Sequence, residues 1–438
     1  MSIKDLLMNK IIDKTAAIGV IGLGYVGLPL AVEAASSGYK VIGFDLQQKK
    51  VAMVNSGINY IGDIENSLLK KVVNKGLLKA TSDFQFVKMV NIILICVPTP
   101  LDNYQQPDIS YVKSSTESVG KYMRKGSLVI LESTTYPGTT EELLLPILEE
   151  KSQLKCEKDF YLAFSPERVD PGNLIYKTKN TPKIVGGIGK DSTEISAALY
   201  RNVLESEIYE VSSAKIAEMV KILENTYRNI NIGLINEMSI ICNKMKINIW
   251  EVIEAAKTKP YGFQPFYPGP GLGGHCIPLD PYYLTWKARE YDYHTRLIET
   301  SGEINSYMPQ YIVERSTKIL NRFGKSLKGA SILVLGIAYK NDINDYRESP
   351  ALKIIENFQN EGAKVSFYDP YIKTYRYKEK EYNGIVLTEE SLKNSDLVVI
   401  STNHKKYDYN FIQKNSKYIF DTRNATKAIA NKENIELL

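Results

Sequence analysis

Residues 16–45 read AAIGVIGLGYVGLPLAVEAASSGYKVIGFD, and this stretch sets the topology of the first part of the chain. A short apolar segment runs into three glycines spaced as GxGxxG, which are Gly22, Gly24 and Gly27. A helical stretch follows, and then a second apolar segment that ends in Asp45. GxGxxG alone is a weak signal. Between a strand and a helix, with an acidic residue about 20 positions later, it predicts a dinucleotide-binding fold.

Each residue type in this segment has a physical role in such a fold. Gly22 permits the tight turn, Gly24 lets backbone N–H groups approach a pyrophosphate, and Gly27 allows close packing of helix and strand. The N-terminus of the helix favours negative charge. Asp45 would accept hydrogen bonds from the adenosine ribose and repel a 2′-phosphate, which predicts NAD rather than NADP. The alternative is a glycine-rich turn beside an aspartate at a strand end.

Three more apolar segments end in polar loops. They are NIILICVPTP (91–100), SLVILESTTYPGTT (127–140) and FYLAFSPER (160–168). In a doubly wound sheet, ligands lie beyond the carboxyl ends of the strands. We therefore expect Thr99, Glu132, Thr134 and Glu167 near the cofactor and the substrate. Each of them could instead be only a turn or cap residue.

Residues 212–245 contain no proline, and their apolar residues recur at a period near 3.6. These are Ile216, Met219, Val220, Leu223, Ile230, Leu234, Ile241 and Met245. The pattern predicts one long helix, capped by Ser212 or Ser213, that connects domains or forms a dimer face. Lys221 and Asn225 share one face of this helix and could polarise a hydroxyl or an oxyanion. The alternative is a solvated pair on an exposed face.

The last third of the chain repeats the first pattern. Residues 360–369, NEGAKVSFYD, match residues 36–45, SSGYKVIGFD, and the segment ASILVLG precedes them as AAIGVIG does earlier. We expect a second nucleotide-fold domain that starts near Leu327. It keeps only Gly336 of the glycine motif. Its loop AYKNDINDYRES carries Lys340, Arg347 and Glu348, and Arg423 ends another strand, so a different phosphorylated ligand could bind there.

The composition describes a globular protein of two or three domains, with 438 residues, 44% of them hydrophobic, and a formal net charge of +5. No Lys/Arg-rich block suggests nucleic acid as a partner. The longest apolar runs are too short to span a membrane, and no signal-peptide core is evident, so we expect a cytoplasmic protein. The four cysteines are widely spaced, which predicts neither a disulfide framework nor a structural metal.

Residues 268–280, PGPGLGGHCIPLD, present Cys276 on a glycine-rich loop beside His275. The segment DPYYLTWKARE that follows is typical of a helix with Asp280 at the N-cap and Pro281 at the first helical position. A thiol ahead of a helix N-terminus and beside a histidine has a lowered pKa. These features favour a reactive Cys276, and the alternative is a thiol packed beside a turn.

The chain resembles the UDP-glucose/GDP-mannose dehydrogenase family along nearly its whole length. The matching segments, in order, are GLGYVG, VPTP, ESTTYPGTT, SPER, the helix with Lys221 and Asn225, GGHCIPLD and AYKNDINDYRES. PYGFQPFYPGPGLGGHCIPLDPYYLTWKARE is most similar to the branch that acts on UDP-N-acetylhexosamines, with UDP-N-acetylglucosamine as the expected substrate. One departure is Pro171, where UDP-glucose enzymes carry a second glutamate. Arg168 and Asp170 also differ from that branch, and Arg168 could contact the N-acetyl group.

The resemblance implies a four-electron oxidation with two NAD, carried out by a three-domain protein that forms a dimer or a higher homo-oligomer. The fold class is α/β, with two Rossmann-like doubly wound domains joined by a central helical domain. We expect an NAD-binding domain at 1–205, a central domain with the catalytic cysteine at 206–315, and a UDP-sugar-binding domain at 316–438. The partners are a UDP-sugar and a second copy of the chain, with neither nucleic acid nor membrane.

The residues and the resemblance together imply three sets of site residues. The catalytic set is Cys276, Lys221, Asn225, Asp280, Glu167 and Thr134. The NAD-binding set is Gly22, Gly24, Tyr25, Val26, Gly27, Asp45, Lys50, Thr99, Thr134 and Arg347. The substrate-binding set is Glu167, Arg168, Val169, Lys221, Asn225, Lys259, Tyr267, Gly273, Lys340 and Arg423, of which Lys259 would reach a neighbouring subunit's site. No metal is expected.

Overall fold

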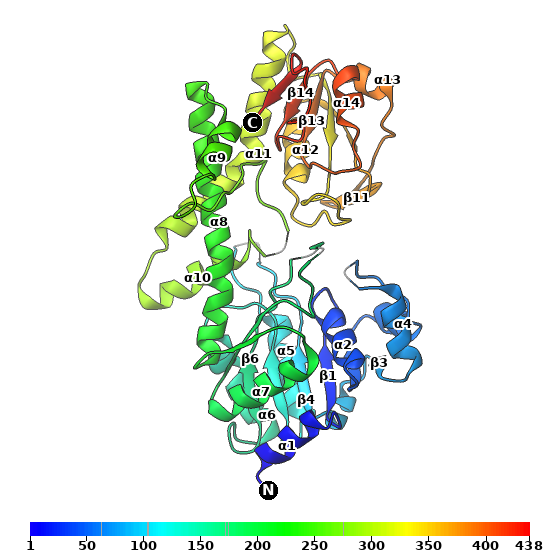
Figure 1. Ribbon diagram of the computed structural model, residues 1–438, viewed down its shortest axis with the longest axis vertical. Coiled ribbons are helices and arrows are strands. Elements are labelled where there is room, and N and C mark those ends of the chain that lie inside the picture. The colour runs from blue at the N-terminus through cyan, green and yellow to red at the C-terminus, as the bar shows by residue number, and fades with distance from the viewer. Residues whose placement is uncertain (63, 103–104, 171, 174, 275) are drawn as a thin grey trace. The chain divides into compact units, whose positions relative to one another are not determined.

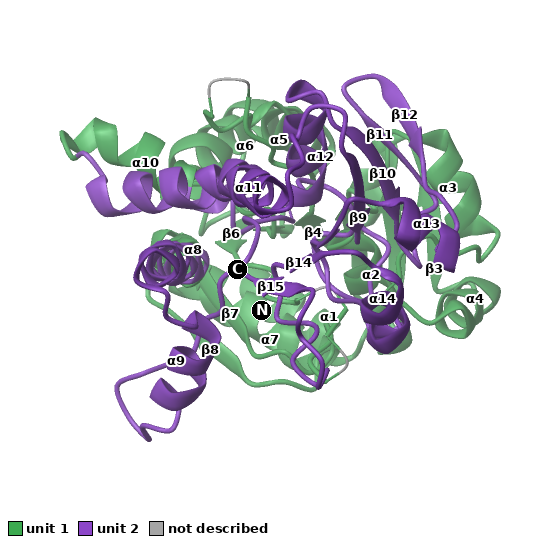
Figure 2. Cartoon of the chain, turned by 90° about the horizontal axis from the view of Figure 1, so that it is seen from above, with its two compact units in different colours: residues 1–224, 282–293 green, residues 225–281, 294–438 purple. Residues whose placement is uncertain are grey.

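The computed structural model describes all residues except 63, 103–104, 171, 174 and 275 (Figure 1). The chain divides into two compact units (Figure 2). Unit 1 contains Met1–Glu224 and Tyr282–Tyr293, and unit 2 contains Asn225–Pro281 and His294–Leu438. Each unit has its own largely parallel sheet, so the predicted α/β class with two Rossmann-like sheets is confirmed. The domain boundaries given above remain a prediction.

The sheet of unit 1 has the strand order β3-β2-β1-β4-β5-β6-β7-β8. Its strands are β1 (Ala17–Ile21), β2 (Lys40–Phe44), β3 (Leu78–Thr81), β4 (Ile92–Ile95), β5 (Leu128–Leu131), β6 (Tyr161–Phe164), β7 (Lys183–Gly187) and β8 (Ile208–Glu210). The first six strands are parallel and have the order of a dinucleotide-binding fold. Strand β7 pairs antiparallel with β6 and extends the sheet.

The helices of unit 1 connect these strands and cover both faces of the sheet. They are α1 (Ile3–Ile12), α2 (Gly27–Ser36), α3 (Gln48–Asn55), α4 (Asn66–Asn74), η1 (Phe84–Met89), α5 (Ser110–Tyr122), η2 (Thr140–Leu144), α6 (Leu145–Ser152) and α7 (Lys190–Val203). Residues that alternate along β4 enter different cores: Ile92 and Leu94 pack in one, Ile93 and Ile95 in the other. Because both strand faces are covered, the central strands β1, β4 and β5 consist of apolar residues, as expected for a doubly wound sheet.

Helix α8 (Ala214–Met245) is the long helix that the sequence predicts, and it is continuous over 32 residues. The backbone N–H of Ile216 donates to the hydroxyl of Ser213 at 3.3 Å, so Ser213 is the predicted cap. The expected apolar stripe is largely exposed; its exposed members are Ile216, Met219, Leu223, Leu234, Ile241 and Met245. The side chains that α8 buries are others, among them Ile222 and Ile235.

Unit 2 contains a five-stranded parallel sheet with the order β10-β9-β13-β14-β15 and a separate hairpin. Its elements are α9 (Ile249–Ala256), α11 (Arg296–Arg322), β9 (Ser331–Leu335), α12 (Pro350–Asn360), β10 (Lys364–Tyr368), β11 (Thr374–Tyr377), β12 (Lys380–Asn383), α13 (Glu389–Asn394), β13 (Leu397–Ile400), α14 (Tyr409–Asn415), β14 (Ile419–Asp421) and β15 (Ile435–Leu437). Helix α10 (Asp280–Ala288) and η3 (Arg289–Tyr291) complete the chain. No helix in the described part of the chain is long and apolar enough to cross a membrane.

The second sheet repeats the strand–turn–aspartate geometry of the first. Asp45 accepts a hydrogen bond from the N–H of Leu23 at 3.0 Å, just after Gly22. Asp369 accepts one from the N–H of Ile337 at 2.7 Å, just after Gly336. The predicted internal echo is therefore present in three dimensions. The two copies differ in the connection from the first strand to the helix that follows. It is short between β1 and α2, whereas a long loop separates β9 from α12.

Candidate active site

The turn between β1 and α2 leaves a backbone surface open to a ligand. Gly22 has φ of +90°, and a Cβ on it would lie 2.7 Å from the carbonyl oxygen of Cys96. A Cβ on Gly27 would lie 1.9 Å from the carbonyl oxygen of Gly22. A Cβ on Gly24 would meet nothing within 4 Å. The space at Gly24 and the N-terminus of α2 together fit a dinucleotide pyrophosphate.

Asp45 closes the predicted NAD site at the end of β2. One of its oxygens accepts the N–H of Leu23, and the other accepts the N–H of Gln47 at 2.9 Å. The ammonium of Lys50 lies 3.6 Å from Asp45 Oδ2. Asp45 is therefore held in place by the glycine turn itself. Of the neighbouring predicted residues, Tyr25 is exposed and Val26 precedes α2.

The loops after β4 and β5 hold the polar residues that the sequence predicts at strand ends. Thr99 is buried, and its carbonyl accepts the hydroxyl of Tyr283. Thr134 is half-buried on the loop after β5. Next to it, Ser133 Oγ donates to the carbonyl of Val97 at 2.7 Å, which ties the two loops together. This placement confirms that the strand-end loops of unit 1 share one edge of the sheet.

The β5 loop is also anchored by a residue that the sequence analysis does not single out. Glu218 of α8 is fully buried and accepts hydrogen bonds from the N–H of Gly138 and from the N–H and hydroxyl of Thr140. Burial raises the pKa of Glu218 to about 7 despite these three donors. Its position three residues before Lys221 on the same helix is the sequence signal that could have revealed it.

Glu167 and Lys221 are in contact within unit 1. The ammonium of Lys221, which is buried, donates to the carbonyl oxygen of Glu167 at 2.6 Å. The Glu167 carboxylate accepts the N–H groups of Arg168 and Val169, each at 2.8 Å. The guanidinium of Arg168 is bonded to Glu224 at 2.6 Å and to the carbonyl of Pro182 at 2.7 Å. Lys221 is thus buried beside the predicted acid–base residue rather than solvated.

The glycines before Cys276 let the cysteine loop pack closely on the second sheet's long loop. A Cβ on Gly273 would lie 2.5 Å from Tyr339 Cβ, and one on Gly274 would lie 2.8 Å from the Tyr339 ring. Gly274 also has φ of +82° and donates its N–H to the carbonyl of Arg347 at 3.2 Å. Cys276 itself is exposed. Glycine is therefore needed here for packing within unit 2.

Two asparagines of α8 hold the segment after Cys276. Asn225 Nδ2 donates to Asp280 Oδ2, and Asn229 Nδ2 donates to the carbonyl of Ile277 at 3.0 Å. Asn225 and Asp280 are both buried, so neither is a solvated surface group. Asn229 was not predicted as a site residue, although it lies four residues after Asn225, as Asn225 does after Lys221.

Helix α10 begins at Asp280, one residue earlier than the predicted start at Pro281. The N–H of Asp280 donates to the carbonyl of Cys276 at 2.8 Å, which closes a turn over residues 276–280 directly before the helix. The carboxylate of Asp280 binds Asn225 across the loop.

The basic residues predicted for the second ligand lie on two loops of unit 2. Lys340 is half-buried on the loop after β9. Arg347, on the same loop, pairs with Asp345 at 2.7 Å. Arg423 Nε donates to the carbonyl of Ser401 at 3.0 Å, and a Cβ on Gly269 would lie 2.5 Å from Arg423 Nη1. Gly269 thus permits close approach of the arginine to the chain that leads to Cys276.

The remaining predicted residues lie on the segment before the glycine loop or outside the description. Lys259 is exposed, with its ammonium 5.2 Å from the ring centre of Tyr261. Tyr267 is exposed, and its hydroxyl donates to Glu254 at 2.9 Å. His275 and Pro171, on which parts of the sequence argument depend, are outside the described residues.

A dinucleotide site in one unit, and an exposed cysteine with basic nucleotide-fold loops in the other, define an NAD-dependent oxidoreductase with a second nucleotide-type ligand. Three domain models of the UDP-glucose/GDP-mannose dehydrogenase family match the chain. They describe its NAD binding domain (residues 16–204), its central domain (215–307) and its UDP binding domain (333–428). The chain belongs to this family, and it is an NAD-dependent nucleotide-sugar dehydrogenase.

Similar proteins of known name support this assignment. A UDP-N-acetyl-D-glucosamine 6-dehydrogenase of Salmonella typhi is 35% identical over 89% of this chain and 90% of its own length. A UDP-N-acetyl-D-mannosamine dehydrogenase of Pyrococcus horikoshii is 38% identical over 94% and 96%. A solved structure of UDP-D-ManNAc dehydrogenase from Pyrococcus horikoshii matches with a TM-score of 0.88, covering 96% of this chain and 98% of that one at 36% identity.

Proposed function

We propose that this enzyme oxidises the C6 hydroxyl of a UDP-N-acetylhexosamine, UDP-N-acetylglucosamine first among them, to the uronic acid for surface polysaccharide synthesis. The observation that carries the proposal is the exposed Cys276 on a loop held by Asn225 and Asn229. A two-electron hydroxyacid dehydrogenase needs no such cysteine and no second nucleotide-fold domain. The relatives named above act on sugar nucleotides of the proposed class.

The proposed reaction proceeds in four balanced steps. The C6 hydroxyl group loses its proton and carbon C6 loses a hydride, which gives an aldehyde. When bound, NAD would accept the hydride in this oxidation and in the second one. The Cys276 thiolate adds to the aldehyde carbon and forms a thiohemiacetal. Loss of a second hydride and of the hydroxyl proton leaves a thioester. Water then attacks the thioester, releasing the carboxylate and the thiol.

The other predicted catalytic residues have roles suited to their chemistry. Lys221 and Asn225, both buried donors, would stabilise alkoxide and oxyanion charge. Glu167 and Asp280 would move protons and activate water, while Thr134 would orient a water or the nicotinamide. Asp280 is both the first residue of α10 and a candidate acid or base, and both roles are retained.

The ligand contacts follow the same division. Lys340 and Arg423 would bind the UDP moiety, and Arg347 would approach the NAD diphosphate. Lys50 and Thr99 would complete the NAD site. For the sugar, we assign contacts to the residues around Glu167 and to the segment before Cys276; these are Arg168, Val169, Tyr267 and Gly273. Arg168 must first leave, or share, its bonds to Glu224 and Pro182.

We also infer a homodimer through α8 and a cytoplasmic location. With Tyr227 and Met238, which are also exposed, the exposed apolar side chains of α8 follow a spacing of three, four or seven residues along one stripe, which is typical of a helix that packs against another. A second copy of the chain is the occupant that this proposal names. Lys259 would then reach the neighbouring subunit's site. The cytoplasm fits an enzyme whose cysteines form no disulfide in the described structure.

A panel of UDP-sugars tests the proposal. The purified protein is incubated with excess NAD and with the UDP derivatives of N-acetylglucosamine, N-acetylmannosamine, N-acetylgalactosamine and glucose. We expect two NADH per UDP-N-acetylglucosamine consumed, with the uronate detected by mass spectrometry. One NADH per sugar would contradict the four-electron reaction. Faster oxidation of another epimer would correct the substrate, and no NADH with any sugar would indicate a binding protein.

A further inference from the structure

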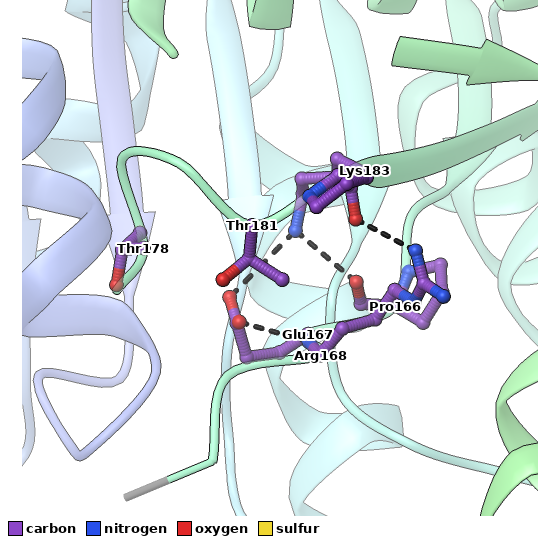
Figure 3. A pocket seen from close by; sticks show the side chains of 7 residues that line it. Pro166, Glu167, Arg168, Thr178, Thr181 and Lys183 are labelled. Atoms are coloured by element: carbon purple, nitrogen blue, oxygen red, sulfur yellow. Dashed lines mark hydrogen bonds and ion pairs between the residues drawn. The ribbon is translucent and has the colours of Figure 1, made fainter. Parts of the chain in front are cut away.

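Lys183 is the first residue of β7, and its buried ammonium group lies next to the predicted acid–base residue Glu167 (Figure 3). The side chain of Lys183 is only 6% exposed. Its Nζ lies 2.7 Å from Glu132 Oε2, 3.2 Å from the carbonyl oxygen of Pro166 and 3.7 Å from Glu167 Oε2. The ammonium thus makes two hydrogen bonds and lies at ion-pair distance from Glu167, an arrangement expected of its charged form.

Glu132, the residue directly after β5, also binds this ammonium. Its Oε2 accepts from Lys183, and its Oε1 accepts the hydroxyl of Tyr200 from α7. Glu132 is fully buried, and a buried carboxylate requires such partners. Burial lowers the pKa of Lys183, but the carboxylates of Glu132 and Glu167 outweigh it and leave this pKa raised. Lys183 is therefore a fixed positive charge.

Both oxygens of the Glu167 carboxylate are consequently placed. Oε1 accepts two backbone N–H groups, those of Arg168 and Val169, and Oε2 faces Lys183. Two hydrogen bonds join the backbone segment 166–168 to the segment 182–183: Lys183 donates to the carbonyl of Pro166, and Arg168 donates to the carbonyl of Pro182. These contacts leave the Glu167 carboxylate little freedom to rotate.

The other titratable groups that face this cluster within unit 1 do not replace Lys183. Burial raises the pKa of the Cys96 thiol and of the Tyr200 hydroxyl, so both stay neutral. Lys221 of α8 binds the backbone carbonyl of Glu167 rather than its carboxylate. Lys183 is the cation whose bonds connect the carboxylate of Glu167 to Glu132.

We propose that Lys183, clamped by Glu132, is a positioning residue for the reaction, because its ammonium holds the Glu167 carboxylate in the orientation in which it acts as a base. The inference deepens the proposed function, since it rests on the acid–base role of Glu167. The inference explains why Glu132 and Lys183 form a buried ion pair, which stability alone would not require. Replacement of a buried pair by uncharged groups is often tolerated by a fold.

The experiment uses the full-length enzyme with NAD and whichever UDP-sugar of the panel it oxidises fastest. The main variant is the double substitution Lys183→Met/Glu132→Gln, which removes both buried charges together and leaves Tyr200 a carbonyl acceptor. Lys183→Arg tests rescue of the charge. Tyr200→Phe is the matched control, because it disturbs the same cluster without touching the contact between Lys183 and Glu167. Folding is followed by thermal unfolding and NAD affinity.

We expect the double variant to fold and bind NAD, with KM within about twofold of wild type and kcat lower by about tenfold or more. The split between kcat and KM is the expected result, because Glu167 has lost the contact that orients its carboxylate. Lys183→Arg should return kcat toward wild type, and Tyr200→Phe should leave kcat within about twofold of wild type. A folded double variant with wild-type kcat overturns the proposal.

Two further variants keep the outcomes distinct. If the double variant does not fold, Glu132→Gln alone provides the test. With Glu132 replaced by an amide, Lys183 is held less firmly, so kcat should fall while KM stays near wild type; an unchanged kcat would contradict the proposal. Glu167→Gln tests the proposed function beneath it. Full activity of that variant would refute the acid–base role of Glu167, whatever the Lys183 variants do.

Discussion

Gly27 and Gly22 are packed so closely that a Cβ on Gly27 would lie 1.9 Å from the carbonyl oxygen of Gly22. Between them, Gly24 has no heavy atom within 4 Å of the position its Cβ would occupy. The two glycines are therefore required for different reasons. Gly27 is needed for the turn to form, whereas Gly24 keeps space for the ligand.

Gly24→Ala should leave the fold intact and weaken NAD binding by about tenfold or more, because the methyl group occupies space that the pyrophosphate needs. Isothermal titration with NAD and thermal unfolding measure the two effects. Gly62→Ala is the matched control, since its Cβ also meets nothing within 4 Å and it lies outside the glycine turn. Gly27→Ala should instead lower the unfolding temperature. Unchanged NAD affinity in Gly24→Ala would refute the pyrophosphate site.

Asp45→Asn should reduce NAD affinity by about tenfold and narrow the preference for NAD over NADP. The amide can still accept one backbone hydrogen bond, but it has no charge to repel a 2′-phosphate. Asp369→Asn provides the comparison, because Asp369 occupies the same place in the second sheet. NAD titration of both variants should show a loss only for Asp45. An equal loss for both, or none for Asp45, would contradict the ribose contact.

Cys276→Ser should stop the reaction before acid release, with at most one NADH per sugar and a drop in uronate formation of at least about a hundredfold. A serine hydroxyl is a poorer nucleophile than a thiolate. Cys156→Ser is the control, since burial raises the pKa of that thiol to about 12 and keeps it protonated. Product analysis by mass spectrometry checks the outcome. Wild-type turnover in Cys276→Ser would remove the nucleophile assignment.

Glu218→Gln should reduce the loss of stability that the wild type shows between pH 4.5 and about 7. The folded pKa of Glu218 is raised to about 7 from an ordinary value of 4.5. Its stabilising contribution is complete below pH 4.5 and is lost as the pH rises through 7, because only the unfolded chain ionises readily. The shift corresponds to about 3 kcal/mol at most.

Urea unfolding midpoints at several pH values measure this dependence. Glu237→Gln is the control, because Glu237 is an exposed glutamate on the same helix. Its variant should follow the wild-type curve. If Glu218→Gln followed the wild-type curve as well, the titration of Glu218 would not contribute.

Leu234→Lys/Ile241→Lys should dissociate the proposed dimer. Both side chains are exposed on α8, and each buried aliphatic side chain contributes about 1.5–3 kcal/mol to an interface. The dissociation constant should therefore rise by about a hundredfold or more. Light scattering coupled to gel filtration gives the mass across a concentration series. Arg228→Glu reverses a charge on a different, exposed face of the same helix and should change little. A wild-type monomer at all concentrations would refute the dimer.

Local sequence periodicity predicted most of the fold. The strands at residues 17–21, 92–95, 128–131 and 161–164 and the length of α8 follow from apolar runs and from the absence of proline. The echo between Asp45 and Asp369 was visible because both aspartates follow a strand at the same spacing from a glycine. The antiparallel pairing of β6 with β7 was not predicted, because strand direction depends on the path of the intervening loop.

Some site residues could also be predicted from the sequence, because they lie close together in the chain or directly after a strand. These include the glycine turn, Asp45, and the pair Lys221 and Asn225, since their chemistry depends on local backbone geometry. The exposed stripe of α8 was read correctly as helical. The exposure of this stripe was not evident from the sequence, because periodicity shows that a helix face is apolar but not what covers that face.

By itself, the amino-acid sequence determined the element types, the two nucleotide folds and the chemical kinds of the site residues, because these follow from short-range spacing. Long-range contacts came only with the folded chain. Asn229 reaches the carbonyl after Cys276, and Lys183 joins Glu132 to Glu167, across separations that no local pattern encodes. The physical reason is that a buried charge or amide needs a partner, and which partner is near depends on how the sheet and helices pack.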